Sequence, residues 1–200
     1  MEQTTDGPGA TGQWFTASDG HRWWFDSGSV ALDFAYTGAM GEAGRWESLH
    51  AASDLDDWLG ARFAAVDGTA SDRDLADGRL LREAIARIAQ ATSDGLPVPA
   101  EAVDTINLFA ATPDIPPVLA GGNRQAGRSR ARPGQALSTM AREAVGLFAP
   151  ESADRIRECA ADDCALVFAD DSRSNNRRWC SMQRCGNRAK VRAHRSRVAG

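Results

Sequence analysis

The sequence predicts an α+β fold that is mainly α, with a helical N-terminal domain that holds a small β element and a short C-terminal module rich in cysteine. Three observations lead to this prediction. Apolar residues recur at helical spacing through the first 150 residues, one stretch near residue 30 is rich in aromatic and branched side chains, and all four cysteines follow residue 158. Two hundred residues suffice for one core of about 100–150 residues plus such a module.

The composition is that of a folded protein without a membrane span. Apolar residues make up 42% of the chain and charged residues 25%, and no apolar run approaches the ~18 residues needed to cross a bilayer. The first residues, MEQTTDGPGATGQ, lack the basic start and apolar stretch of a secretion signal. We therefore expect a flexible N-terminus over residues 1–20, a cytoplasmic location with reducing conditions, and no membrane partner.

The N-terminal domain is expected over residues 21–150, and its first part carries the β element. The stretch HRWWFDSGSVALDFAYTG (21–38) mixes aromatic and branched residues with glycines at turn positions, which predicts one or two short strands. Ser53-x-x-Asp56 is an acidic form of the capping box, and the apolar residues after it predict a helix at about 53–65. Most tryptophans fall in this third of the chain, where large aromatics are more often core than the lining of a ligand pocket.

Three further helices complete the domain. Ser71-x-x-Asp74 opens the longest, and Gly95 ends it. The next begins after Pro99 and ends near Thr112, and the last spans about 135–148. Between them lies AGGNRQAGRSRARPGQ, which has four arginines, no acidic residue and many glycines. We expect a mobile basic loop at 121–134, with a second phosphate-contacting arm as the alternative.

The cysteines form two matched pairs, Cys159-x4-Cys164 and Cys180-x4-Cys185, separated by fifteen residues. Zn²⁺ takes four soft ligands in a tetrahedron, and two short loops that each present two thiolates meet that need. The pattern therefore predicts one structural zinc ion. A fully coordinated site leaves no open position for a catalytic water, so the metal is expected to hold the fold.

The residues between and after the cysteine pairs suit a small zinc module. We expect residues 165–168 and 177–179 to pair as a hairpin, with polar turn chemistry between them. Gly186 and Asn187 are expected to bring the backbone close to the metal, and a helix is expected from Ala189 onward. A knuckle, a hairpin and a helix are typical of a treble-clef-like zinc finger, which we place at 151–200.

Other roles for the cysteines fit less well. Structural disulfides are rare in reducing compartments, and nothing in the sequence suggests export. A nucleophilic cysteine is disfavoured because the pairs leave no odd thiol and His194 has no evident orienting carboxylate. Iron–sulfur ligation stays open, although the spacings differ from the usual ones.

Charge divides the chain into two unlike parts. Residues 1–171 carry 14 basic and 27 acidic side chains, whereas residues 172–200 carry nine basic and none acidic, so the net charges are −13 and +9. A local positive field attracts phosphates even when the whole molecule is acidic, although a solvated basic tail is the plain alternative.

The expected C-terminal helix carries its charges in a stripe. At about 100° per residue, Arg188, Arg192 and Arg195 fall on one face, where unpaired like charges destabilise a helix unless phosphates neutralise them. Trp179 is expected to pack the finger rather than to stack on a base. The residues expected to contact nucleic-acid phosphates are Arg177, Arg178, Arg188, Lys190, Arg192 and Arg195.

Residues 159–197, CAADDCALVFADDSRSNNRRWCSMQRCGNRAKVRAHRSR, closely resemble the CGNR zinc finger, whose name motif stands at 185–188. Upstream, GSVALDFAYTG, ESLHAASDLDDWL and LLREAIARI resemble the ABATE domain that commonly precedes this finger. Where that family usually has Phe-x-Asn-Thr, this chain has Phe-Ala-Tyr-Thr, with Tyr36 in place of the asparagine. The resemblance implies a stress-induced transcription regulator with a zinc-binding, DNA-binding finger.

We therefore expect a zinc-dependent DNA-binding transcription regulator whose N-terminal domain senses a small molecule or makes a dimer. RNA as the partner, a homodimer and an unidentified effector stay open. The alternative is a finger that acts only as a protein-interaction or dimerisation clamp, its basic face docked on the acidic remainder. We expect no enzyme and no catalytic residue, because His21 and His50 have no recognisable catalytic partners.

Overall fold

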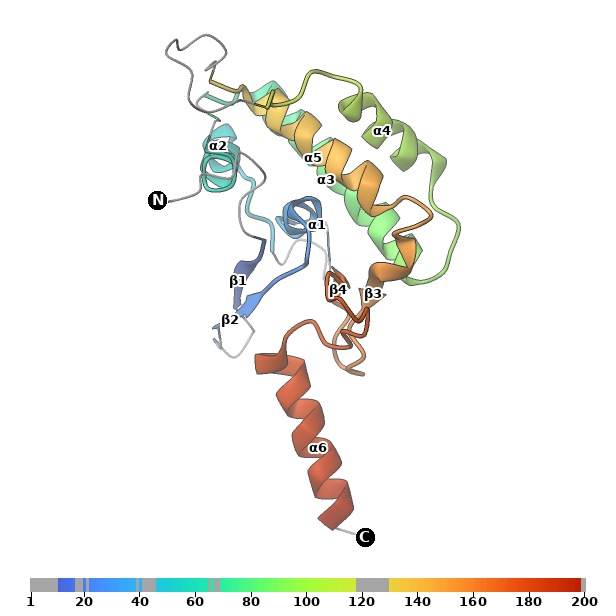
Figure 1. Ribbon diagram of the computed structural model, residues 1–200. Helices are drawn as coiled ribbons and strands as arrows, with labels where there is room; N and C mark the ends of the chain where they lie inside the picture. The colour runs from blue at the N-terminus through green and yellow to red at the C-terminus, as the bar shows by residue number, and fades with distance from the viewer. Residues whose placement is uncertain are drawn as a thin grey trace.

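The protein is α+β and mainly helical, as predicted (Figure 1). The computed structural model describes residues 11–16, 20, 22–38, 40, 46–64, 66, 69–117 and 130–198. The N-terminal part contains β1 (Gln13–Thr16), β2 (Arg22–Phe25), α1 (Val30–Ala35), α2 (Ala52–Gly60), α3 (Asp72–Ser93), α4 (Ala100–Ala110) and α5 (Pro133–Leu147). The C-terminal part contains the 3-10 turn η1 (Ala153–Arg155), β3 (Ile156–Glu158), β4 (Val167–Ala169), the π-helical turn η2 (Met182–Gly186) and α6 (Asn187–Val198).

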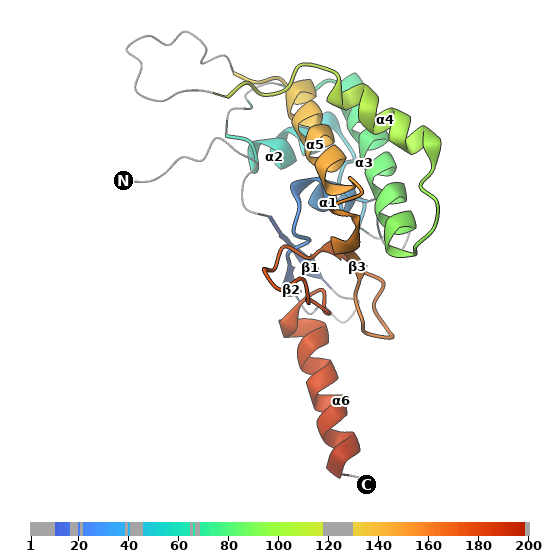
Figure 2. The same cartoon turned by 45° about the vertical axis from the view of Figure 1, so that its right-hand side comes forward.

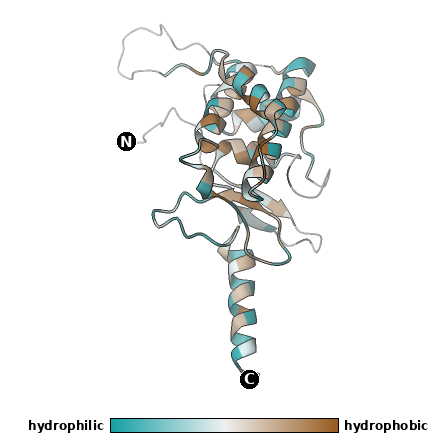
Figure 3. Ribbon diagram, turned by 90° about the vertical axis from the view of Figure 1, so that its right-hand side faces the viewer, coloured by the Kyte–Doolittle hydropathy of each residue, from teal (hydrophilic) through white to brown (hydrophobic). Residues whose placement is uncertain are grey.

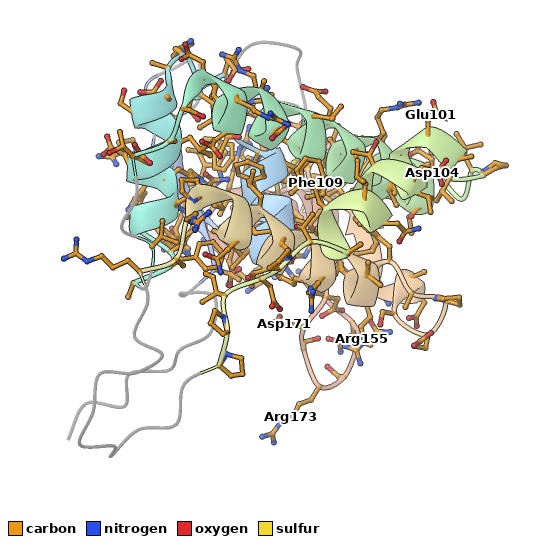
Figure 4. All side chains as sticks on the ribbon, turned by 90° about the horizontal axis from the view of Figure 1, so that it is seen from above. Glu101, Asp104, Phe109, Arg155, Asp171 and Arg173 are labelled. Carbon is orange, nitrogen blue, oxygen red and sulfur yellow. The ribbon has the colours of Figure 1, made fainter. Side chains whose placement is uncertain are left out.

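Three helices, α3, α4 and α5, pack side by side over α1 (Figure 1, Figure 2). Seen from above, Phe109 of α4 lies toward this helical layer, while Glu101 and Asp104 lie at the outer end of the same helix (Figure 4). Apolar residues at helical spacing along α3, including Leu81 and Ile85, are buried. Burial of such stripes is what holds helices of this length together in water.

The strand prediction for residues 21–38 is correct only at its start. β2 pairs with β1 as an antiparallel hairpin, but Val30–Ala35 forms helix α1 instead of a second strand. The Ser29 hydroxyl caps this helix, and the Glu143 carboxylate of α5 accepts hydrogen bonds from Ser29 Oγ (2.8 Å) and Val30 N (3.0 Å). Every residue of α1 is buried, so the segment lacks the one-sided apolar pattern that marks a surface helix.

Several predicted bounds are also corrected. β1 lies within the 1–20 segment that was expected to be flexible, and residues 1–10 and 17–19 lie outside the described part. α2 ends at Gly60, and the box that caps it is formed by Asp54 with the Ala51 N–H, because Asp56 instead accepts from Ala70 N (2.8 Å).

The Ser71 and Asp74 capping box of α3 is confirmed. Most of the expected loop at 121–134, namely residues 121–129, lies outside the described residues, so its mobility stays a prediction. Its last two residues belong to α5, which begins at Pro133 because proline suits the first turn of a helix.

The C-terminal module packs onto the N-terminal part through β4. The Tyr36 hydroxyl, at the end of α1, donates to Val167 O (2.9 Å) and accepts from Val167 N (2.8 Å). Next to it, Ala169 N donates to Ser27 O (2.8 Å). Tyr36, Val167 and Ala169 are all buried and belong to one hydrophobic cluster that continues from the helical layer into the cysteine region. The finger is therefore held against the domain by backbone pairing and shared core.

Candidate metal centre and basic helix

The sulfur atoms of Cys159, Cys164, Cys180 and Cys185 lie within 4.8 Å of one another, and the cysteines are free thiols. Cys180 Sγ lies 3.7 Å from Cys164 Sγ and 3.5 Å from Cys185 Sγ. Four thiolates around a tetrahedral zinc ion, each about 2.3 Å from the metal, are about 3.8 Å apart. The two distances from Cys180 Sγ are therefore close to the edge length of a zinc tetrahedron, and the ligand set predicted from the sequence is brought together.

The first pair of cysteines sits at the tip of the β3–β4 hairpin. Cys159 N donates to Leu166 O (2.9 Å), and Cys164 N donates to Ala161 O (3.0 Å), so the backbone turns tightly between the two ligands. The predicted pairing of residues 165–168 with 177–179 is wrong, since β4 pairs with β3. Residues 177–179 instead pass beside the knuckle, where the Arg178 carbonyl accepts from Ala160 N (2.8 Å).

The second pair of cysteines lies around η2, the turn that leads into α6. Cys180 precedes this turn and Cys185 lies within it, while α6 begins two residues later. Gly186 was expected to let the backbone approach the metal, but its close neighbours are side chains. A Cβ there would lie 2.5 Å from Met182 Sδ and 3.3 Å from the Trp179 ring, so the glycine makes room for both.

The ionisation of the thiols shows why the site needs a cation. Hydrogen bonding from the Cys164 thiol, and next from Cys180, lowers the pKa of Cys159, while hydrogen bonding with Cys159 raises the pKa of Cys164 to about 12. The Cys159 thiolate thus keeps the Cys164 thiol protonated. A divalent cation removes this conflict, because it stabilises all four negative charges at once. These cysteines form a structural zinc centre.

The loop between β4 and the second cysteine pair is organised by Asp170. Its buried carboxylate accepts from Ser172 N (3.0 Å), Ser172 Oγ (2.5 Å) and Arg177 N (2.7 Å). Burial alone would raise the pKa of this carboxyl, but these hydrogen bonds outweigh it and the pKa is lowered. Arg173 lies at the outer end of the loop and points away from the body (Figure 4).

Arg177 has a structural role that was not predicted from the sequence. Its guanidinium donates to Asp26 O (2.6 Å) and Cys180 O (2.7 Å), and it lies 4.2 Å from the centre of the Phe168 ring. These bonds link the N-terminal part to the second metal loop. The Nε and Nη2 donors of Arg177 are thus used inside the protein, and its expected contact with phosphate stays a prediction.

α6 projects away from the rest of the molecule (Figure 1, Figure 3). It holds five basic residues and no acidic one, its main packing partner is η2, and residues 190–197 are exposed. Teal bands, which mark hydrophilic residues, alternate with tan ones along its ribbon in Figure 3. Lys190 and Arg195 are exposed on this helix, and so is Arg178 beside it, with its guanidinium 5.2 Å from the Trp179 ring centre.

Two arginines of the predicted stripe share an acidic partner within the finger. Arg188 Nη1 lies 2.9 Å and Arg192 Nη2 3.3 Å from Asp163 Oδ2, on the first metal knuckle. Arg188 also donates to Cys185 Sγ (3.2 Å), and this bond to the sulfur raises the pKa of the guanidinium. Asp163 was not predicted from the sequence as part of this site, because only the folded knuckle brings it next to α6.

The structure combines a helical domain with a four-cysteine zinc finger that shares its core and carries a projecting basic helix. These features define the class of zinc-finger proteins with an N-terminal accessory domain. Among the described residues, none of the helices combines the length and apolar character needed to cross a bilayer. The chain belongs to the ABATE family, described as "Putative stress-induced transcription regulator", whose model matches residues 28–151, and residues 155–198 match the CGNR zinc finger. A search of curated proteins finds no match.

Proposed function

We propose that the protein is a zinc-dependent transcription regulator that binds duplex DNA through α6 and the neighbouring surface of its finger. The observation that carries this proposal is α6 itself, a projecting, exposed helix with five basic side chains and no acidic one. A helix of this kind fits the major groove, and its cations neutralise phosphates. The family description supports a regulatory role over an enzymatic one, and a thiolate zinc site supports a reducing, cytoplasmic compartment.

The ion pairs to Asp163 are compatible with this proposal. The Asp163 side chain is about half exposed, as are those of Arg188 and Arg192, so each pair contributes only about 0–1 kcal/mol. An incoming phosphate replaces such a partner at little cost. We expect the DNA-contacting set to be Arg178, Lys190, Arg192 and Arg195, with Arg188 kept mainly beside the metal.

The ion pairs also bear on the clamp alternative. In the described part of the chain, the acidic partner of Arg188 and Arg192 is Asp163 of the same finger, whereas the clamp needs an acidic patch elsewhere. We therefore place DNA binding first. The N-terminal domain is proposed to sense an effector or to dimerise, roles that the family description supports only in general terms.

The test is the binding of a 20-base-pair duplex to full-length, zinc-loaded protein, measured by fluorescence anisotropy over a range of salt concentrations. With about four phosphates contacted, the log–log slope of affinity against salt should be about −3.6. Lys190/Arg192/Arg195→Ala should lower the magnitude of the slope by about 2.7 and weaken binding, while alanine preserves the helix. Removal of zinc with a chelator should abolish binding, because the finger has little core of its own.

The matched control is Arg73/Arg87→Ala, which removes two exposed arginines from α3. It should leave both affinity and slope unchanged. If the α6 triple variant retains zinc and binds as tightly as the parent, the proposal is wrong. Absence of any nucleic-acid binding at low salt, together with a dimer that dissociates at high salt, would establish the clamp instead.

A further inference from the structure

The outer face of the β1–β2 hairpin exposes two tryptophans side by side. Alternation along the strands buries Phe15 and Trp23, and leaves Trp14 58% and Trp24 39% exposed. The two indoles meet edge to face with their centres 5.5 Å apart. Large aromatics that gather on a surface, instead of standing alone, mark sites of interaction.

This face continues into the finger across an open cavity with a volume of about 570 Å³. Trp24 and Asp26 line it from the hairpin side, and Arg178, Trp179 and Met182 line it from the finger side. Residues more than 150 positions apart thus share one concave surface. We call Trp14, Arg22, Trp24, Arg178 and Trp179 the tryptophan–arginine surface.

The rings of this surface are held in place by close backbone contacts. Gly12, with φ +103°, lies directly against Trp24, because a Cβ at this position would be 2.5 Å from the indole. Gly12 thus packs against the Trp24 indole, which also lines the cavity. On the finger side, Gly186 supports Met182 and Trp179 in the same way. A platform that is ordered before binding loses little entropy when a flat ligand stacks on it.

An arginine lies at each end of the tryptophan–arginine surface. The Arg22 guanidinium lies 5.1 Å from the centre of the Trp14 ring, and that of Arg178 lies 5.2 Å from the centre of the Trp179 ring. Both arginines are exposed. Among the described residues that line the cavity, Asp26 is the acidic one, and its carboxylate already accepts from Gly28 N (2.9 Å). Flat apolar rings that alternate with guanidinium groups match a ligand with aromatic bases and phosphates.

We propose that the tryptophan–arginine surface binds single-stranded nucleic acid, with unpaired bases stacked on Trp24 and Trp14 and phosphates on Arg22 and Arg178. A duplex hides the flat faces of its bases, so stacking on exposed tryptophans selects unpaired segments. Two platforms and two separate cations suit a strand better than a free nucleotide. The tryptophans of this surface lie outside α6, and Arg178 is the residue that the surface shares with the set expected to contact duplex DNA.

The experiment measures the affinity of full-length, zinc-loaded protein for a fluorescein-labelled dT12 oligonucleotide, together with quenching of tryptophan fluorescence. Trp24→Ala and Trp14→Ala should each lower affinity about 5- to 150-fold, the range expected for loss of one base–aromatic stack. Trp24→Phe should retain most of the affinity, because phenylalanine also stacks. Leu108→Ala, which removes an even more exposed apolar side chain from α4, should have no effect.

Two outcomes would overturn the proposal. In the first, Trp14→Ala and Trp24→Ala, with zinc retained, bind dT12 as the parent does, and a dimer of the parent becomes a monomer in the variants, which would make the face a contact between copies. In the second, dT12 binding disappears in Lys190/Arg192/Arg195→Ala and is insensitive to Trp24, which places the strand on α6. The second result would leave the proposed function intact, whereas failure of duplex binding alone would leave the tryptophan–arginine surface intact.

Discussion

Tyr36→Phe tests whether the finger depends on the N-terminal domain for its stability. The Tyr36 hydroxyl is the partner of both backbone groups of Val167 that face away from β3, at 2.8 and 2.9 Å. Phenylalanine keeps the ring and its edge-to-face contacts with Phe15 and Phe25, so the change removes the hydroxyl alone. Burial raises the pKa of Tyr36, so the group stays a neutral donor and acceptor at all relevant pH values.

The magnitude follows from the two groups left without a partner. Val167 and Tyr36 are buried, so no water replaces the lost bonds. A buried, unsatisfied backbone group costs about 1–3 kcal/mol, which gives about 2–6 kcal/mol for the N–H and C=O together. This is a large part of the about 5–15 kcal/mol that stabilises an ordinary domain.

Urea unfolding followed by tryptophan fluorescence measures the effect, with zinc release recorded in parallel by a chromogenic chelator. We expect the unfolding midpoint to fall and zinc to be released at a lower urea concentration than in the parent. Ser93→Ala is the control, because its hydroxyl bonds to Gln90 O at an exposed helix end and its loss should change stability by less than about 0.5 kcal/mol. A Tyr36→Phe protein within 0.5 kcal/mol of the parent would refute the reasoning.

Two more predictions concern charge. Asp163→Asn should raise affinity for duplex DNA by up to about tenfold, because it frees Arg188 and Arg192 from an exposed partner; an unchanged or lower affinity in the anisotropy assay would contradict this. Burial raises the pKa of Asp33 from 3.8 to about 6, so the folded state holds this proton more tightly than the unfolded chain. The stabilisation that comes from protonated Asp33 is present below about pH 4 and is lost as the pH rises through about 6. Between these pH values, the free energy of unfolding of the parent, measured in urea, should fall by up to about 3 kcal/mol relative to that of Asp33→Asn. Parallel pH profiles of the two proteins would refute this prediction.

The zinc ligands and the long helix were predictable because their signals are local. Thiolates are few, and two pairs at equal spacing meet the needs of a tetrahedral ion wherever the loops lie. The Ser71 and Asp74 box likewise acts within one turn, and both its hydrogen bonds are present in α3. Such features depend on contacts between residues a few positions apart, which tertiary packing seldom overrides.

The wrong predictions of secondary structure concern segments that could pack or pair with more than one neighbour. Residues 165–168 could pair either with the segment before them or with residues 177–179 after them. They pair with β3, because Asp170 turns the following loop and Arg178 O accepts a hydrogen bond from the knuckle. Val30–Ala35 has strand-like composition, but the carboxylate of Glu143, more than 100 residues away, stabilises its helical N-terminus. Composition alone carries no record of such long-range contacts.

The sequence by itself determined the metal chemistry and the sign of the charge on the last helix, because thiol spacing and side-chain charge are properties of the chain. Tertiary structure decided how these parts are used. It placed Arg177 in the domain junction and Asp163 beside α6, and it left Trp24 exposed next to the finger. These outcomes depend on which distant surfaces meet and exclude water, and burial and pairing of that kind exist only once the chain has folded.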